Sequence, residues 1–158
     1  MYITEDDWKS KGLPNKLSEI IEVALKDLES LENDKNYCID MQEYYSFDSD
    51  LKQCQVCLAG CILAREFELP LDYEFSICNV DTFVYNKLNM LDDVRQGSFR
   101  SAIYVSLGSV DSGRAIAERV NGLIKEEVGG LWDTYRESPR TFKENLKIAV
   151  KILKENGL

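Results

Sequence analysis

The sequence predicts a single, mainly α-helical domain of about five to seven helices. Apolar residues recur at intervals of three and four over most of the chain, and this spacing places them on one face of a helix. The 158 residues are 44% hydrophobic and include only three prolines, so one domain with a substantial core fits the length. The segments between the helical patterns are too short to separate domains, and residues 1–158 are therefore expected to fold as one unit.

The first part of the chain is expected to contain a long helix and then a non-helical segment. Apolar side chains recur every three and four positions over residues 17–31, so a helix is predicted to begin after residues 13–15 and to end near Glu32. Residues 37–42 alternate weakly between apolar and polar side chains and predict a short strand or extended segment. Residues 44–50 are expected to form a loop that is rich in aromatic and acidic side chains.

A second helix, from about Leu51 to Phe67, is predicted to carry three of the five cysteines on one face. Cys54, Cys57 and Cys61 are separated by three and four residues, and such spacing aligns side chains along a helix. Their neighbours are valine, leucine, alanine and isoleucine, among which a free cysteine behaves as a small buried hydrophobe. We therefore expect buried, reduced thiols, in line with the odd number of cysteines.

Two alternatives for the cysteines stay open from the sequence. Four thiolates suit zinc or an iron–sulfur cluster, and Cys38, Cys54, Cys57 and Cys61 would supply such a set, with Cys78 as a replacement for Cys38. Redox chemistry at the same thiols is the other alternative. The apolar neighbourhood favours packing over both, so neither a metal nor a cofactor is expected.

Capping residues and glycines divide the second half of the chain into further short helices. Serine, asparagine and aspartate favour helix starts, and glycine favours the position after a helix end. Serine followed by proline is a strong start signal for the last helix. The predicted boundaries are Asn79 or Asp81, Gly97, Gly108, Ser109 or Ser112, Gly129-Gly130, Ser138-Pro139 and Gly157.

The composition narrows the classes of function. The chain has 19 basic and 28 acidic residues, a net charge of −9, and a surface of this sign repels phosphate backbones, so direct nucleic-acid binding is not expected. It contains no histidine, which excludes serine–histidine and cysteine–histidine catalysis and histidine-containing metal sites. We therefore expect a protein that is not an enzyme.

The distribution of apolar residues predicts a cytoplasmic protein. The longest apolar run, at residues 56–64, is too short to span a bilayer. The first eight residues are acidic and lack the apolar core of a signal peptide. No membrane association is expected, and the oligomeric state is left open.

The aromatic and acidic loop is the first candidate for binding a partner. Carboxylates beside aromatic rings suit a cationic group or a basic protein cleft. The competing interpretation is that the carboxylates only cap the following helix. The candidate contact residues are Tyr44, Tyr45, Phe47, Asp48 and Asp50.

A glycine- and serine-rich segment is the second candidate. Backbone N–H groups at the start of a helix can hold a phosphate, and an adjacent arginine would add positive charge. The segment lacks the lysine of a nucleotide-binding loop, and an ordinary turn with a capping serine explains it as well. The candidate ligand residues are Ser109, Ser112, Gly113 and Arg114.

Three segments resemble uncharacterised small proteins of tailed bacteriophages and their prophages. The stretch Cys54–Gly60 is similar to a C-x-V-C-L-A-G-A segment of such proteins, and Leu88–Gly97 is similar to a second one, in which leucines precede an arginine and a glycine. The closing stretch Phe142–Leu158 extends the resemblance to about half of the chain. Cys61 departs from the pattern, which has alanine there, and this departure puts a three-cysteine metal site in doubt.

The resemblance implies a phage-encoded accessory protein that acts on host machinery or host defence. Together with the acidic charge, it predicts a non-enzymatic protein that binds and inhibits a bacterial host or defence protein, such as a nucleic-acid-binding complex, in an anti-CRISPR-like manner. One alternative is a small-ligand binder that sequesters a nucleotide signal through the glycine–serine segment. A second alternative is a metalloprotein or enzyme that uses the cysteines.

Overall fold

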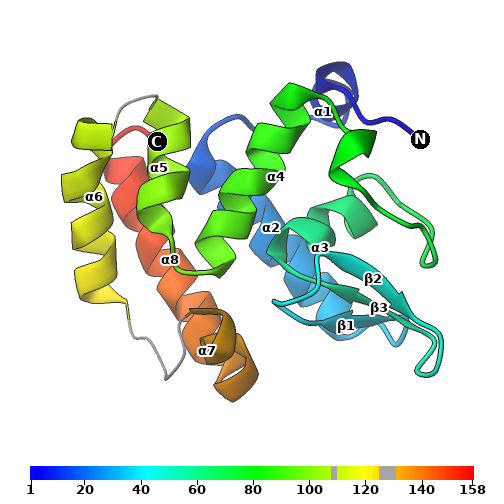
Figure 1. The fold of residues 1–158 in the computed structure, drawn as a ribbon. Coiled ribbons are helices and arrows are strands. Elements are labelled where there is room, and N and C mark those ends of the chain that lie inside the picture. The colour runs from blue at the N-terminus through cyan, green and yellow to red at the C-terminus, as the bar shows by residue number, and fades with distance from the viewer. Residues whose placement is uncertain (108–109, 125–130) are drawn as a thin grey trace.

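The computed structural model describes residues 1–107, 110–124 and 131–158 (Figure 1). The prediction of a mainly helical protein is confirmed, and the first three residues of the extended segment predicted at residues 37–42 form a strand. Within the described residues there are eight α-helices, one more than the upper end of the predicted range, and a three-stranded sheet of which only one strand was predicted. The elements are α1 (Glu5–Ser10), α2 (Leu17–Glu32), β1 (Tyr37–Ile39), β2 (Tyr45–Asp48), β3 (Gln53–Val56), α3 (Leu58–Arg65), the 3-10 helix η1 (Ile77–Asn79), α4 (Thr82–Arg95), α5 (Phe99–Leu107), α6 (Val110–Leu123), α7 (Leu131–Glu137) and α8 (Pro139–Glu155).

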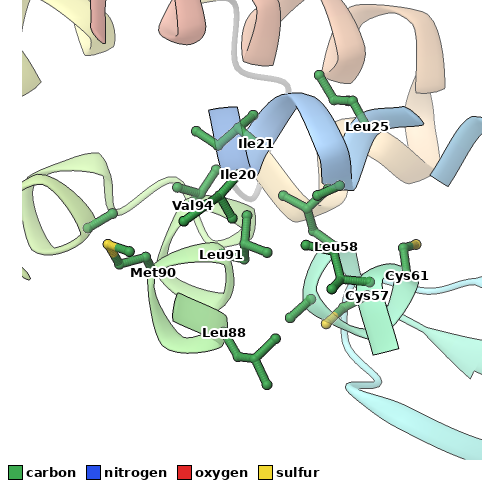
Figure 2. Packing of buried hydrophobic residues seen from close by; sticks show 14 of the residues in the cluster. Ile20, Ile21, Leu25, Cys57, Leu58, Cys61, Leu88, Met90, Leu91 and Val94 are labelled. Atoms are coloured by element: carbon green, nitrogen blue, oxygen red, sulfur yellow. The ribbon is translucent and has the colours of Figure 1, made fainter. Parts of the chain in front are cut away.

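Helix α2 lies at the centre of the molecule. It contacts α8, α5, α3, α4 and β1, and it lies between α5, α6 and α8 at the left of Figure 1 and the sheet at the right. Figure 2 shows the centre of this packing, where Ile20 and Ile21 of α2 lie near Leu58 of α3 and Leu91 of α4. All four side chains are fully buried, and each such residue stabilises the fold by about 1.5–3 kcal/mol.

Side-chain caps and one glycine account for the helix boundaries that the sequence predicted correctly. The carboxylate of Asp81 accepts a hydrogen bond from the N–H of Val84 at 2.9 Å and starts α4. The hydroxyl of Ser138 accepts one from the N–H of Thr141 at 3.2 Å and starts α8, with proline as the first helical residue. Gly97 follows α4 with a φ of 81°, a conformation that glycine adopts without strain. The predicted break at Gly129-Gly130 lies outside the described residues.

The prediction of one helix from about Leu51 to Phe67 was wrong in its first part. Residues Gln53–Val56 form β3, the central strand of a sheet with the order β1-β3-β2. β1 runs parallel to β3, and β2 pairs with β3 in an antiparallel hairpin. Only α3, which begins at Leu58, is helical. The alternating burial of β3 explains the strand, because every second side chain enters the core.

Helix α3 packs directly on the start of β2 through a glycine. A Cβ atom placed on Gly60 would lie 2.0 Å from the carbonyl oxygen of Tyr44 and 3.0 Å from the Cβ of Val56. Only a residue without a side chain allows this approach of a helix to a strand. The helix therefore fixes the position of the backbone where β2 begins.

None of the helices in the described part of the chain is long and apolar enough to cross a membrane.

Candidate functional site

The three clustered cysteines are divided between a strand and a helix. Cys54 lies on β3, Cys57 occupies the N-cap of α3, and Cys61 lies inside α3, so the expectation that they share one helix face was wrong. Their predicted burial is confirmed, because all three are 0% exposed. Figure 2 shows Cys57 and Cys61 beside Leu58 in the core.

Burial sets the chemistry of these thiols. Desolvation raises the pKa of Cys54 to about 11 and that of Cys57 to about 11, and it raises the pKa of Cys61 well above its ordinary value. The thiols are therefore protonated near neutral pH. A thiolate is the form that attacks an electrophile or binds a metal, so these three side chains are suited to packing.

The other two cysteines lie apart from this group in burial and position. Cys38 is half-buried on β1, and Cys78 is exposed in η1. Within the described residues, no three or more histidine, cysteine, aspartate or glutamate side chains form a group that could hold a metal ion. The alternative set of Cys38, Cys54, Cys57 and Cys61 is therefore not brought together as metal ligands.

The predicted phosphate-binding loop is largely a helix. Ser109 lies outside the described residues, while Ser112, Gly113 and Arg114 lie within α6, which begins at Val110. Gly113 is buried, and a Cβ placed on it would lie 2.9 Å from the Cγ2 atom of Ile103 on α5. Its role is thus a close contact between two helices. Arg114 is exposed.

The two tyrosines of the predicted contact loop are structural. Tyr45 is 6% exposed, and its hydroxyl lies 2.9 Å from the carbonyl oxygen of Leu69 and 2.8 Å from that of Pro70, so it donates a hydrogen bond shared between them. Tyr44 is half-buried and stacks on Phe75, with ring centroids 5.4 Å apart. Burial raises the pKa of both phenols. These rings hold residues 69–75 alongside β2.

The other predicted contact residues lie at the tip of the β2–β3 hairpin. The loop predicted at residues 44–50 is mostly a strand, because β2 spans Tyr45–Asp48. Phe47 is 39% exposed near the end of β2, and Asp50 is exposed in the turn. The carboxylate of Asp48 accepts hydrogen bonds from the N–H of Asp50 at 2.9 Å and from that of Leu51 at 3.1 Å. Asp48 therefore stabilises the turn, and of the two predicted carboxylates only Asp50 is exposed.

A groove lies between β2 and the segment that the two tyrosines hold. Its volume is about 500 Å³. Its wall carries two exposed carboxylates and four aromatic residues, and none of the described residues that line it is basic. The lining residues are Tyr45, Ser46, Phe47, Asp72, Tyr73, Glu74 and Phe75.

Sequence reasoning missed one wall of this groove. Asp72 and Glu74 alternate with Tyr73 and Phe75, and this alternation is visible in the sequence. It resembles the aromatic and acidic composition of residues 44–50, which contain the predicted contact residues. The sequence does not show that Tyr44 stacks on Phe75, and this contact brings residues 72–75 alongside residues 44–50.

A second hollow, of about 350 Å³, lies beside the other edge strand, β1. Asp40 and Arg136 both line it, so its charges are mixed. Pro139 and Met41 contribute apolar surface. This hollow is less selective for the charge of a ligand than the groove beside β2.

Comparison of the chain with known protein families, with curated proteins and with solved structures gives no match.

Proposed function

We propose that this protein is a non-enzymatic binding protein that docks the groove beside β2 onto a basic region of a protein partner. The observation that carries this proposal is the pairing of exposed carboxylates, at Asp72 and Glu74, with the rings of Phe47, Tyr73 and Phe75 in one groove. A lysine or arginine side chain can contact a carboxylate and the face of a ring at the same time. Each cation–π contact contributes about 0.5–1 kcal/mol at an exposed site.

The charge of the whole chain supports the same kind of partner. A net charge of −9 attracts a basic surface over distances of about a Debye length, roughly 8–10 Å at physiological salt. Such attraction accelerates encounter and selects the partner, while buried aromatic contacts slow dissociation. The groove offers both kinds of contact.

The buried cysteines support a binding role over catalysis. Three of the five thiols lie in the core with raised pKa values, and a nucleophilic cysteine needs a lowered one. The chain has no histidine to serve as a general base.

The resemblance to phage accessory proteins suggests which partner to look for. We propose a bacterial host or defence protein in the cytoplasm, whose basic groove would otherwise hold nucleic acid. An acidic protein can occupy such a groove and inhibit the complex in an anti-CRISPR-like manner. This setting requires neither direct nucleic-acid binding nor membrane association by the protein itself.

A charge reversal in the groove tests the proposal. Affinity capture from a bacterial lysate, at low and high salt, compares the wild type with the double variant Asp72→Lys, Glu74→Lys. The matched control is Glu118→Lys, Glu137→Lys, which makes the same change of charge at exposed positions on α6 and α7. We expect the wild type and the control to capture the same basic protein and the groove variant to lose it.

An assay of infection or interference supplies the functional readout. The groove variant is expected to lose any inhibition of host defence, while the control variant keeps it. Equal capture and equal inhibition by the groove variant would show that the partner binds elsewhere.

A further inference from the structure

The outer edge of β2 is open along the groove, and the pattern of hydrogen bonds in the sheet shows which of its backbone groups face outward. The central strand β3 bonds β1 through two of its residues. Cys54 donates its N–H to the carbonyl of Asn36 at 2.9 Å. Asp40, which follows β1, donates its N–H to the carbonyl of Val56 at 2.9 Å. Cys54 and Val56 therefore direct their backbone groups toward β1.

The remaining residues of β3 face the other way. Successive residues of a strand direct their N–H and C=O groups to opposite sides, so Gln53 and Gln55 face β2. In the antiparallel register, Gln55 lies opposite Ser46 and Gln53 lies opposite Asp48. Ser46 and Asp48 are thus the residues of β2 that bond to the sheet.

It follows that Tyr45 and Phe47 direct their N–H and C=O groups away from the sheet. β2 is an edge strand, and no hydrogen bond to another described segment engages the backbone groups of these two residues. Both line the groove. The hollow of about 500 Å³ therefore borders a row of unpaired donors and acceptors, which is the template that an additional strand requires.

The opposite wall of the groove determines which strand fits. Asp72, in a turn, and Glu74, two residues later, are both exposed there, so the groove offers two carboxylates to an extended chain, whose alternate side chains lie on one face. Two lysine or arginine side chains at alternate positions of that chain can reach them. Tyr73 and Phe75 supply apolar surface for the intervening side chains.

We infer that the groove receives an extended, basic segment of the partner, which pairs as a fourth strand with the outer edge of β2. This inference rests on the proposed function and adds the conformation and the chemistry of the bound segment. β1 is also an edge strand, but the mixed charges beside it do not select a basic segment in the same way.

A synthetic peptide tests the strand pairing directly. The probe is a fluorescent, acetylated and amidated octapeptide in which lysine alternates with valine, and its binding to the full-length protein is measured by fluorescence anisotropy. The matched peptide with glutamate in place of lysine is expected not to bind. The variant Asp72→Lys, Glu74→Lys is expected to bind the lysine peptide about tenfold more weakly, as the loss of about 1.4 kcal/mol gives.

Methylated peptides separate strand pairing from attraction between charges. In an added strand, alternate N–H groups face β2 and the others face solvent. We therefore prepare two further peptides, one N-methylated at the lysines and one at the valines. Strand pairing predicts that one loses about five- to tenfold in affinity, as the loss of one or two hydrogen bonds gives, and that the other keeps its affinity. Equal binding of both peptides overturns the inference.

A pair of substitutions at one position makes the same test on the protein. Phe47→Pro removes an outward N–H and leaves the β2–β3 hydrogen bonds intact, since an edge strand tolerates proline at such a position. Phe47→Ala removes the same ring and keeps the N–H. We expect the proline variant to bind the peptide about fivefold more weakly than the alanine variant, with circular dichroism confirming that both are folded. Equal affinity of two folded variants overturns the inference.

The failure of this inference and that of the proposed function give different results. If the lysine peptide does not bind, or if both methylated peptides bind equally, while Asp72→Lys, Glu74→Lys still loses the captured partner, the strand pairing is wrong and the proposed function stands. If that variant captures the partner as well as the wild type does, the proposed function is wrong as well.

Discussion

The two sides of the β2–β3 hairpin differ in how closely they are packed. On the inner side, a Cβ atom on Gly60 would lie 2.0 Å from the carbonyl oxygen of Tyr44, so the backbone of α3 contacts the backbone immediately before β2. On the outer side, β2 borders a hollow of about 500 Å³. We call the side of the hairpin where Gly60 meets Tyr44 the packed side, and the side that borders the groove the open side. The packed side fixes the position of the backbone of β2, and the open side exposes that backbone to a partner.

The strongest test of the packed side is Gly60→Ala. The added methyl group would overlap a backbone oxygen that cannot rotate away, so α3 or β2 must shift. We expect the free energy of unfolding to fall by roughly 3 kcal/mol in urea denaturation. The control is Gly122→Ala in α6, where a Cβ meets nothing within 4 Å, and where alanine is expected to be neutral or to stabilise by up to about 1 kcal/mol. A Gly60→Ala variant as stable as the wild type would show that the contact is not tight.

A buried carboxyl group makes the packed side sensitive to pH. Asp27 of α2 is 6% exposed, and its Oδ2 atom has no hydrogen-bond partner. Desolvation, together with the neighbouring carboxyl of Glu66 at the end of α3, raises the pKa of Asp27 to about 8, and the charges of Arg65 and Lys26 only partly oppose this rise. A protonated Asp27 can donate to Glu66, whereas two ionised carboxylates would repel each other.

The stability of the protein is therefore expected to fall as the pH rises. The pKa of Asp27 is about 8 in the folded chain, against 3.8 for a free aspartate side chain, so the folded state binds more protons between these values. Stability contributed by this group is complete below about pH 4 and is lost progressively up to about pH 8, with a slope of at most about 1.4 kcal/mol per pH unit. Urea denaturation at several pH values measures the slope. Asp27→Asn should remove this part of the slope, and an unchanged slope would contradict the assignment.

The cysteines provide a smaller effect on the same side. Cys57→Ser buries a hydroxyl where a thiol lies in the core, and we expect the free energy of unfolding to fall by about 1–3 kcal/mol. The control, Cys78→Ser, changes an exposed thiol and should remain within about 0.5 kcal/mol of the wild type. Stoichiometric zinc or iron that stays bound to the purified protein through dialysis would contradict the view that these thiols only pack.

Local signals predicted the helices well, and the hairpin was missed because its signals are shorter. The stripe of α2 and the Ser138-Pro139 start of α8 each lie within one continuous segment, and both were predicted correctly. β3 has only four residues, and the spacing of Cys54, Cys57 and Cys61 also fits a helix. A short apolar run is ambiguous between the two structures.

The groove could not be predicted because it depends on contacts between distant residues. The hydroxyl of Tyr45 reaches the backbone of Leu69 and Pro70, 24 and 25 residues away. The ring of Tyr44 stacks on Phe75, which lies still further along the chain. The sequence therefore indicated an acidic and aromatic surface at residues 44–50, of which Tyr45 and Phe47 line the groove, but it did not indicate Asp72 and Glu74, which supply the exposed carboxylates of the groove.

The smallest effect on stability is expected on the open side. Asp72 and Glu74 are both exposed, so the variant Asp72→Lys, Glu74→Lys should unfold within about 0.5 kcal/mol of the wild type. Asp48→Lys is the informative contrast, because Asp48 accepts two hydrogen bonds in the hairpin turn and its loss should cost about 1 kcal/mol. Asp50→Lys, at an exposed position in the same turn, should leave stability unchanged.

The groove variant, which should change stability little, should change the rate of association most. If the groove is the contact surface, reversing its two charges slows association with a basic partner and flattens the dependence of the rate on salt, because steering depends on these charges. Asp50→Lys should slow association less, since Asp50 is not among the residues that line the groove. Stopped-flow measurements at several salt concentrations compare the variants. A groove variant that associates like the wild type at every salt concentration would place the contact surface elsewhere and leave the packed side of the hairpin without the role argued for it.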